Sequence, residues 1–164
     1  MIVIALGSNL RSSAGSPAET LAAALKALSK TGVRIIGVSS FYATPAWPDP
    51  YDPPFVNAAA RVETKLAPGA LMKLLHKIEN DFGRTRCAKN APRTLDLDLI
   101  DYSGRVDEGP PVLPHPRIAE RAFVLIPLAE VAPGWRHPVS GLSVEKLIAA
   151  IPAGERAAIK RASA

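Results

Sequence analysis

The sequence predicts an α+β protein: a ferredoxin-like βαββαβ antiparallel sheet with helices on one face and a helical C-terminal extension. Apolar runs typical of strands alternate with segments whose apolar residues recur every three or four positions, as in helices. Right-handed crossovers would bring both inner helices to the same face and leave the other face free for a site. Residues 1–164 suit a single domain with a sizeable core.

The first part of the chain predicts a strand, a helix and a second strand. Residues 2–6 form a continuous apolar run that ends at Gly7, as expected of a central strand. Ser16 opens a capping box with proline at the first helical position, and the helix that follows ends at Gly32. Residues 33–43 are rich in β-branched and aromatic side chains, which predicts one strand.

A proline-rich loop precedes the next strand and helix. Residues 44–54 contain five prolines, which exclude a regular strand because proline donates no backbone hydrogen bond. Residues 55–64 predict a strand whose successive side chains alternate between its two faces. A helix is expected from near Pro68 to Gly83.

The C-terminal part predicts one more strand and then helices. The strand covers residues 95–102, where leucine alternates with aspartate. A helix is expected over residues 121–131, kinked or restarted at Pro127, and a last helix starts at Ser143.

Bulk composition narrows the possible partners. The net charge of +5 favours anionic ligands, whereas an aromatic content of 5% argues against a surface that stacks nucleic-acid bases. No apolar run approaches the roughly 20 residues of a membrane-spanning helix. The single cysteine, Cys87, excludes an internal disulfide and fits a reducing compartment. We therefore expect a cytoplasmic monomer that binds small molecules, without a nucleic-acid or membrane partner.

Residues 83–102 carry the strongest chemical signal. Several basic residues lead directly into Asp96 and Asp98, which lie two positions apart within the predicted strand. Side chains at that spacing project from the same face, with Cα atoms about 6.5 Å apart. Two such carboxylates can share a pair of magnesium ions about 3.5–4 Å apart, and neighbouring arginines can bind phosphate oxygens. A half-exposed strand with no site would also alternate in this way, but the arginine-rich loop before it favours a polyphosphate site.

Residues 89–100, Lys-Asn-Ala-Pro-Arg-Thr-Leu-Asp-Leu-Asp-Leu-Ile, resemble the signature of the 6-hydroxymethyl-7,8-dihydropterin pyrophosphokinase family of folate biosynthesis. Further segments resemble that family in the same order along the chain: residues 5–10, 39–45, 55–59, 113–116 and 121–125. The resemblance implies the same fold. It also implies transfer of a pyrophosphoryl group from ATP to the hydroxymethyl oxygen of the pterin, with release of AMP.

The resemblance gives roles to residues of the polyphosphate site. It implies that Asp96 and Asp98 hold two Mg²⁺ ions on the phosphates of ATP. Arg84 and Arg93 match the catalytic arginines, which contact the α- and β-phosphates. For that role the strand must begin after Arg93, and the preceding Pro92 favours such a start.

The resemblance also implies two binding regions. Phe55 and Phe123 match a pair of rings that stacks on the pterin, and Asn57 matches an amide that binds its edge. Thr44 and Pro45 match a loop whose backbone completes recognition. The residues that match the ATP side are His76, Glu79, Arg86, Lys89, Leu99, His115 and Arg121. Core packing would also explain the two phenylalanines, but Phe55 shares its strand face with Asn57, which favours the site.

The chain departs from the family pattern at Lys89-Asn90-Ala91, where Arg-Trp-Gly is frequent, and at Phe55, where tyrosine is frequent. Two other functions remain open. The βαββαβ order and the basic charge also describe an RNA-binding module of the RRM type, although such modules carry aromatic-rich strands. An enzyme using the same carboxylate pair for nucleotidyl transfer would release inorganic pyrophosphate in place of AMP.

Overall fold

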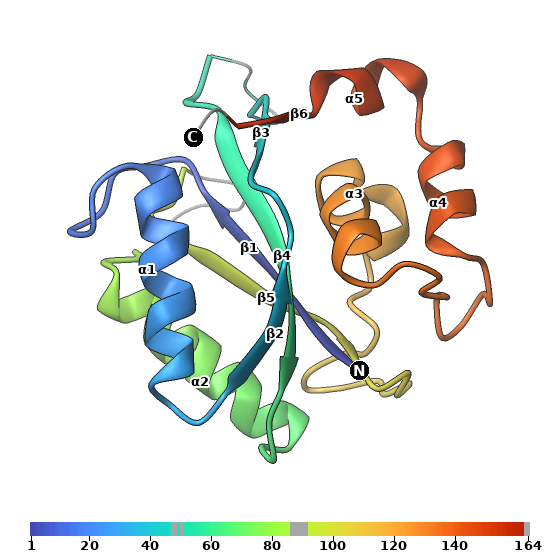
Figure 1. The fold of residues 1–164 in the computed structure, drawn as a ribbon, viewed down its shortest axis with the longest axis horizontal. Coiled ribbons are helices and arrows are strands. Elements are labelled where there is room, and N and C mark those ends of the chain that lie inside the picture. The colour runs from blue at the N-terminus through green and yellow to red at the C-terminus, as the bar shows by residue number, and fades with distance from the viewer. Residues whose placement is uncertain (47–48, 50, 86–91, 163–164) are drawn as a thin grey trace.

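The computed structural model describes residues 1–46, 49, 51–85 and 92–162. Within these ranges an antiparallel sheet is covered by helices (Figure 1). In chain order the elements are β1 (Ile2–Ser8), α1 (Pro17–Ser29), β2 (Arg34–Val38), β3 (Tyr42–Thr44), β4 (Phe55–Glu63), α2 (Pro68–Asp81), β5 (Asp96–Tyr102), the 3-10 turn η1 (Ile118–Glu120), α3 (Ala122–Val131), α4 (Val144–Ala150), α5 (Ala153–Ala158) and β6 (Lys160–Arg161).

Strand β1 lies between β5 and β4 in the sheet. The described strands follow the order β5-β1-β4-β3-β6, and β2 also pairs with β4. Both neighbours of β1 run antiparallel to it, and their register places Gly7 opposite Asn57 on one side and opposite Asp96 on the other. Side chains far apart in the sequence therefore meet at one end of β1.

Residues 33–43 form two strands, so the prediction of a single strand is wrong. The chain leaves the ladder at Ser39, whose hydroxyl accepts a hydrogen bond from the Ala59 backbone N–H at 3.0 Å. The Ser40 backbone N–H and hydroxyl donate to the carboxylate of Glu130 on α3 at 3.0 and 2.9 Å. These contacts satisfy the backbone at the break, and β3 then resumes pairing with β4.

Helices α1 and α2 pack on one face of the sheet, as predicted. The capping box at Ser16 is present: its hydroxyl accepts from the Glu19 N–H, and the Glu19 carboxylate accepts from the Ser16 N–H. Beneath the helices, every second side chain of the central strands enters a hydrophobic core, including Ile4, Ala60 and Leu97. Strand alternation therefore turns the intervening side chains toward the opposite face.

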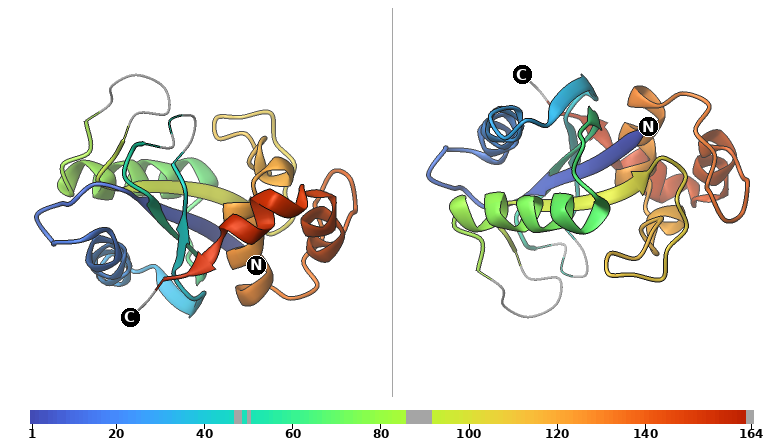
Figure 2. Two further views of the ribbon diagram at one scale, coloured as in Figure 1. Left: turned by 90° about the horizontal axis from the view of Figure 1, so that it is seen from above. Right: turned by 90° about the horizontal axis from the view of Figure 1, so that it is seen from below.

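That opposite face is only partly free, contrary to the prediction of helices on one face. Helix α3 lies on it, on the far side of the sheet from α1 and α2, and α4 packs against α3 (Figures 1 and 2). They form a second hydrophobic core with Val3, Ala59 and Ile100. The reason is the composition of α3, which is apolar nearly all round and must be buried. Pro127 lies inside α3 without ending it.

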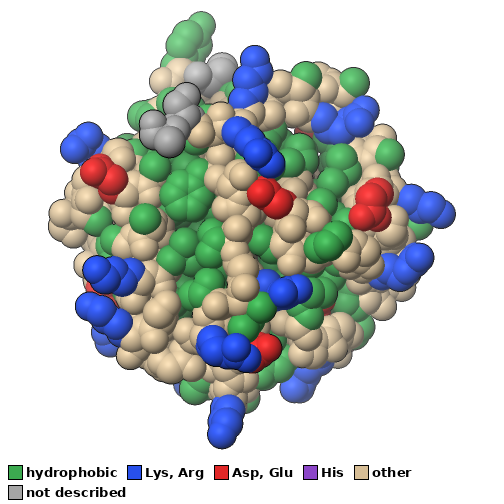
Figure 3. Space-filling view, viewed as in Figure 1, with side chains coloured by type: hydrophobic (Ala, Val, Ile, Leu, Met, Phe, Trp, Pro, Cys, Tyr) green, Lys and Arg blue, Asp and Glu red, His purple; other side chains and the backbone are tan. Residues whose placement is uncertain are grey.

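The surface view shows no single basic patch on the face it presents. Lys and Arg side chains are spread around a central area where hydrophobic side chains reach the surface (Figure 3). None of the helices in the described ranges has both the length and the apolar character needed to cross a membrane. Because the basic side chains on this face are scattered, we expect an anion to bind where the fold brings several arginines together.

Replacing Leu125 with alanine tests the placement of α3. This side chain is fully buried in the second core, and we expect its truncation to lower the free energy of unfolding by about 2–5 kcal/mol. Urea denaturation measures the change. Leu142→Ala is the matched control, because Leu142 is 43% exposed and its truncation should change stability by less than about 1 kcal/mol. Equal small losses in the two variants would contradict burial of α3.

Candidate active site

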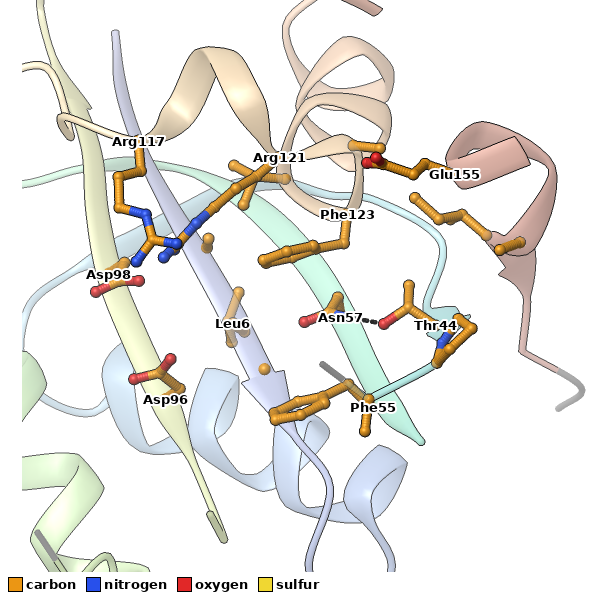
Figure 4. A pocket seen from close by; sticks show the side chains of 18 of the residues that line it. Leu6, Thr44, Phe55, Asn57, Asp96, Asp98, Arg117, Arg121, Phe123 and Glu155 are labelled. Atoms are coloured by element: carbon orange, nitrogen blue, oxygen red, sulfur yellow. Dashed lines mark hydrogen bonds between the residues drawn. The ribbon is translucent and has the colours of Figure 1, made fainter. Parts of the chain in front are cut away.

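A cavity of about 490 Å³ lies on the face of the sheet opposite α1 and α2. It occupies the part of that face that α3 leaves uncovered, at the end of β1 where the three strands meet (Figure 4). Each of these strands contributes lining residues: Ala5, Leu6 and Gly7 from β1, Phe55 and Asn57 from β4, and Asp96 and Asp98 from β5.

Glycine is required at the floor of this cavity. A Cβ atom on Gly7 would lie 2.9 Å from Asn57 Oδ1 and 3.9 Å from the Cβ atom of Asp96. Any larger residue would push the amide out of place, because 2.9 Å is closer than carbon and oxygen pack without a hydrogen bond. Because Gly7 has no side chain, the Asn57 amide and the Asp96 carboxylate stay accessible from the cavity.

Asp96 and Asp98 both project into the cavity, as their spacing predicts (Figure 4). Leu97 between them is fully buried in the core on the other face. Because β5 begins at Asp96, Arg93 precedes the strand, as its predicted role requires. Arg93 Nη1 donates to Asp96 Oδ2 at 2.9 Å.

Arg84 joins the same carboxylate to α2. Its Nη1 donates to Asp96 Oδ1 and to Glu79 Oε1, and Glu79 Oε1 also accepts from the Leu97 backbone N–H at 2.8 Å. Burial alone would lower the pKa of Arg84, but the carboxylates of Asp96 and Glu79 reverse the effect and raise it. Glu79 is 1% exposed, so it lies behind Arg84 and holds this guanidinium against the aspartate.

The ionised form of Asp98 is disfavoured in this cavity, and a bound cation would stabilise it. Burial, followed by the charge of Asp96, raises the pKa of Asp98, although His115, Arg121 and Arg84 partly counter the rise. Two carboxylates that share one face offer the oxygen ligands that Mg²⁺ prefers, and a divalent ion would remove their mutual repulsion. The residues therefore fit a magnesium site.

His115 is fixed beside this pair by backbone contacts. Its backbone N–H donates to Ile100 O at 2.9 Å, and its Nδ1 accepts from the Arg117 N–H at 3.2 Å. Because Nδ1 accepts, the neutral ring carries its proton on Nε2, which lies 3.9 Å from Asp98 Oδ2. Burial lowers the pKa of His115, and Asp98 offsets only part of that effect. The ring therefore favours its neutral form.

Two further guanidinium groups face the aspartates. Arg121, a predicted ATP-binding residue, lines the cavity, and Arg117 lies beside it; both point toward Asp98 (Figure 4). Burial, followed by the charge of Arg117, lowers the pKa of Arg121. Sequence reasoning missed Arg117, although it follows the predicted His115 by two positions. A ligand with several negative charges would relieve the repulsion between these cations.

The other half of the cavity is aromatic. Phe55 and Phe123 project into it from opposite sides, with Asn57 between them (Figure 4). Phe123 is 37% exposed, so ordinary core packing does not explain it. Asn57 Nδ2 donates to Thr44 Oγ1 at 2.8 Å, which leaves the amide oxygen as an acceptor toward the cavity. Pro45 also lines this half.

Two other predicted site residues, Leu99 and His76, are not part of the described cavity lining. The side chain of Leu99 enters the core beneath α1 and α2, on the far side of β5 from the aspartates. His76, on α2, is not among the described residues that line the cavity. Arg86 and Lys89 lie outside the described residues.

Part of the cavity wall had no signal in the sequence. Glu155 and Ala158 of α5 and the adjoining Ile159 line the cavity together with α3 and β3. Residues 153–159 carry no motif that marks them. Their position depends on the pairing of β6 with β3, which joins segments far apart in the chain.

The sequence matches known proteins over most of its length. Residues 3–133 match the family model described as 7,8-dihydro-6-hydroxymethylpterin-pyrophosphokinase. A Methylorubrum extorquens protein named 2-amino-4-hydroxy-6-hydroxymethyldihydropteridine pyrophosphokinase is 42% identical over 132 residues, which cover 79% of this chain and 81% of the relative. A protein of the same name from Synechocystis is 38% identical over 148 residues, 89% of this chain and 73% of the relative.

Two solved structures share the fold. The wild-type HPPK-DHPS of Plasmodium falciparum superimposes with a TM-score of 0.66 at 14% identity, over 90% of this chain and 44% of that one. An HPPK-DHPS crystallised with substrates gives a TM-score of 0.71 at 12% identity, over 98% of this chain and 48% of that one. The chain thus spans slightly less than half of each solved chain, and the likeness concerns the fold alone.

The state of His115 predicts a dependence of stability on pH. The unfolded chain binds a proton at the ordinary histidine pKa of 6.5, whereas the folded chain does so only at lower pH. The free energy of unfolding should therefore fall as the pH falls below 6.5 toward the lowered pKa. His115→Asn should flatten part of this decline, since the amide oxygen can replace Nδ1 as acceptor. Urea unfolding between about pH 5 and pH 7.5 measures both proteins, and identical slopes would contradict a neutral, half-buried ring.

Proposed function

The chain belongs to the 7,8-dihydro-6-hydroxymethylpterin-pyrophosphokinase family, and we propose that it makes pterin diphosphate and AMP from ATP and 6-hydroxymethyl-7,8-dihydropterin in folate biosynthesis. One observation carries the proposal for this chain. The same cavity holds paired carboxylates and arginines in one half and two aromatic rings with an amide in the other. A polyphosphate and a flat heterocycle would thus lie next to each other.

The charged half suits phosphoryl transfer. This reaction requires little covalent chemistry from a protein, so most of the rate must come from positioning and charge stabilisation. Arg84 and Arg93 converge on Asp96 from two directions, and we propose that they contact the α- and β-phosphates. Arg121 and Arg117 would bind the outer phosphates, because their guanidinium groups enter the same space.

Asp96 and Asp98 would hold the magnesium, for which two ions are expected with ATP. When bound, Mg²⁺ neutralises phosphate charge and lowers the pKa of a coordinated hydroxyl group. The two carboxylates must be ionised for this role. The His115 ring lies 3.9 Å from Asp98, and in its neutral form it carries no positive charge that would compete with the metal for this carboxylate. Arg84 and Arg93 keep Asp96 in place at the start of β5.

The aromatic half suits the pterin. A flat ring system with donors and acceptors along its edge needs stacking partners and a fixed polar group. Phe55 and Phe123 supply the two stacking surfaces. The Thr44 hydroxyl oxygen accepts a hydrogen bond from Asn57 Nδ2, so the amide oxygen of Asn57 would accept from a ring N–H or amino group of the pterin. The backbone at Thr44 and Pro45 would complete the recognition.

We also propose the fold type, domain organisation, oligomeric state and compartment of this protein. The βαββαβ unit is ferredoxin-like, and the segment after α3 is its C-terminal extension. Both hydrophobic cores share β1, β4 and β5, which supports a single domain over residues 1–164. A monomer suffices, because the described cavity is built from one chain. Use of ATP and a dihydropterin favours the cytoplasm.

Removing the carboxylate pair provides the central test. The protein is incubated with Mg-ATP and the hydroxymethyl dihydropterin, and AMP is quantified. Asp96→Asn combined with Asp98→Asn should reduce AMP formation by at least about a thousandfold, with an unchanged circular dichroism spectrum. Asp81→Asn is the control, since this exposed aspartate on α2 pairs only with Lys77 in the described structure. Release of inorganic pyrophosphate in place of AMP would indicate nucleotidyl transfer.

Asn57 should discriminate between the two substrates. Asn57→Ala removes the acceptor in the aromatic half and should raise the KM for the pterin about 10- to 100-fold, as loss of a buried hydrogen bond does. The KM for ATP should change by less than about threefold. Thr44→Val removes the partner that orients the amide and should have a smaller effect of the same kind. A similar rise in both KM values would argue against a separate pterin subsite.

A further inference from the structure

The C-terminal segment, residues 153–162, reaches the cavity although the family model matches only residues 3–133. The segment consists of α5 and β6, which run from the helical side of the molecule to the edge of the sheet (Figures 1 and 2). Glu155, Ala158 and Ile159 line the cavity. These three residues lie beyond the stretch that the family model matches.

Main-chain pairing attaches the segment to the aromatic half of the cavity. Strand β6 pairs antiparallel with β3, with Arg161 opposite Tyr42, and the Ala162 backbone N–H donates to Phe41 O at 2.8 Å. Strand β3 ends at Thr44, the residue that orients the amide in the cavity. The position of β6 is therefore coupled to the group that binds the edge of the heterocycle.

A carboxylate of α3 fixes both β3 and β6. Glu130 Oε2 accepts from the Tyr42 hydroxyl at 2.9 Å, and its two oxygens bind the hydroxyl and N–H of Ser40. Arg161 Nη2 lies 3.7 Å from Glu130 Oε1. Helix α3 thus carries Phe123 and also, through Glu130, holds β6 in place. The stacking ring and residues 153–162 are therefore connected through α3.

The side chains of the segment suit a heterocycle. Ile159 is half-buried and offers an apolar surface beside the rings. Glu155 is exposed at the rim, on the side of Phe123 and away from Asp96 and Asp98 (Figure 4). A carboxylate there accepts hydrogen bonds from N–H and amino groups and repels anions. It therefore favours a donor-rich heterocycle and disfavours a phosphate in this half.

We infer that residues 153–162 form the outer wall of the heterocycle subsite and determine which heterocycles it accepts, an inference that rests on the proposed function. Ile159 closes the apolar end of the subsite, and Glu155 selects a ring with hydrogen-bond donors on its edge. The segment is a binding element, and it takes no part in the chemistry at the phosphates.

Ile159→Ala tests the apolar wall. Loss of the side chain should raise the KM for the pterin roughly tenfold, the effect of a small change in an apolar pocket, with kcat and the KM for ATP changed by less than about twofold. Ile148→Ala is the matched control, because Ile148 on α4 is partly buried against the same core and does not line the described cavity. It should lower the melting temperature similarly without changing either KM.

Glu155→Gln tests the acceptor at the rim. The amide keeps the shape and removes the charge, so the KM for the pterin should rise by roughly two- to tenfold. Glu145→Gln on α4 changes an exposed glutamate away from the cavity and should have no effect. A variant pair at positions 155 and 159 that leaves the pterin KM unchanged, or that raises both KM values equally, overturns the inference.

A binding titration separates this inference from the proposed reaction. Pterins fluoresce, so the Kd of 6-hydroxymethylpterin can be measured without turnover for the wild type and both variants. A wild-type protein that binds the pterin and forms no AMP contradicts the proposed reaction, and the ratio of Kd values then decides the role of the wall. A wild-type protein that does not bind the pterin overturns both.

Discussion

The site depends on the double pairing of β1 with β4 and β5. This register sets Gly7 between Asn57 and Asp96 and brings the amide and the carboxylates to one floor. Burial of Leu97 and its neighbours beneath α1 and α2 determines the register. A shift by one residue would turn Asp96 and Asp98 into that core and expose leucines to the cavity. The apolar face of the sheet therefore positions polar groups that lie on its other face.

The charged half of the cavity contains carboxylates and guanidinium groups side by side, which favours a ligand that carries both positive and negative charge. Burial and the charge of Asp96 raise the pKa of Asp98, whereas burial and the charge of Arg117 lower the pKa of Arg121. A bare polyphosphate would satisfy only the arginines, and a bare cation only the carboxylates. A metal-bound polyphosphate satisfies both, which is a physical reason to expect the two to bind together.

Local patterns were enough to predict β1, β4 and β5, which form the floor of the site, and α1 and α2, which pack behind it. The spacing of Asp96 and Asp98 predicted their common face, and the capping box at Ser16 predicted the start of α1. The break at Ser39 could not be predicted, because its compensating partner, Glu130 of α3, lies 90 positions away from Ser40. The role of residues 153–159 escaped for the same reason, since β6 spans only two polar residues and its pairing with β3 is non-local.

The two halves of the cavity are physically connected through arginines. Arg93 binds Asp96, and its Cζ atom lies 5.9 Å from the centre of the Phe55 ring. Arg121 faces the aspartates, and its Cζ atom lies 5.6 Å from the centre of the Phe123 ring. A phosphate that draws on these guanidinium groups changes the charge beside both rings, and cation–π contacts depend on that charge. We therefore expect occupation of one half to alter binding in the other, and such coupling acts equally in both directions.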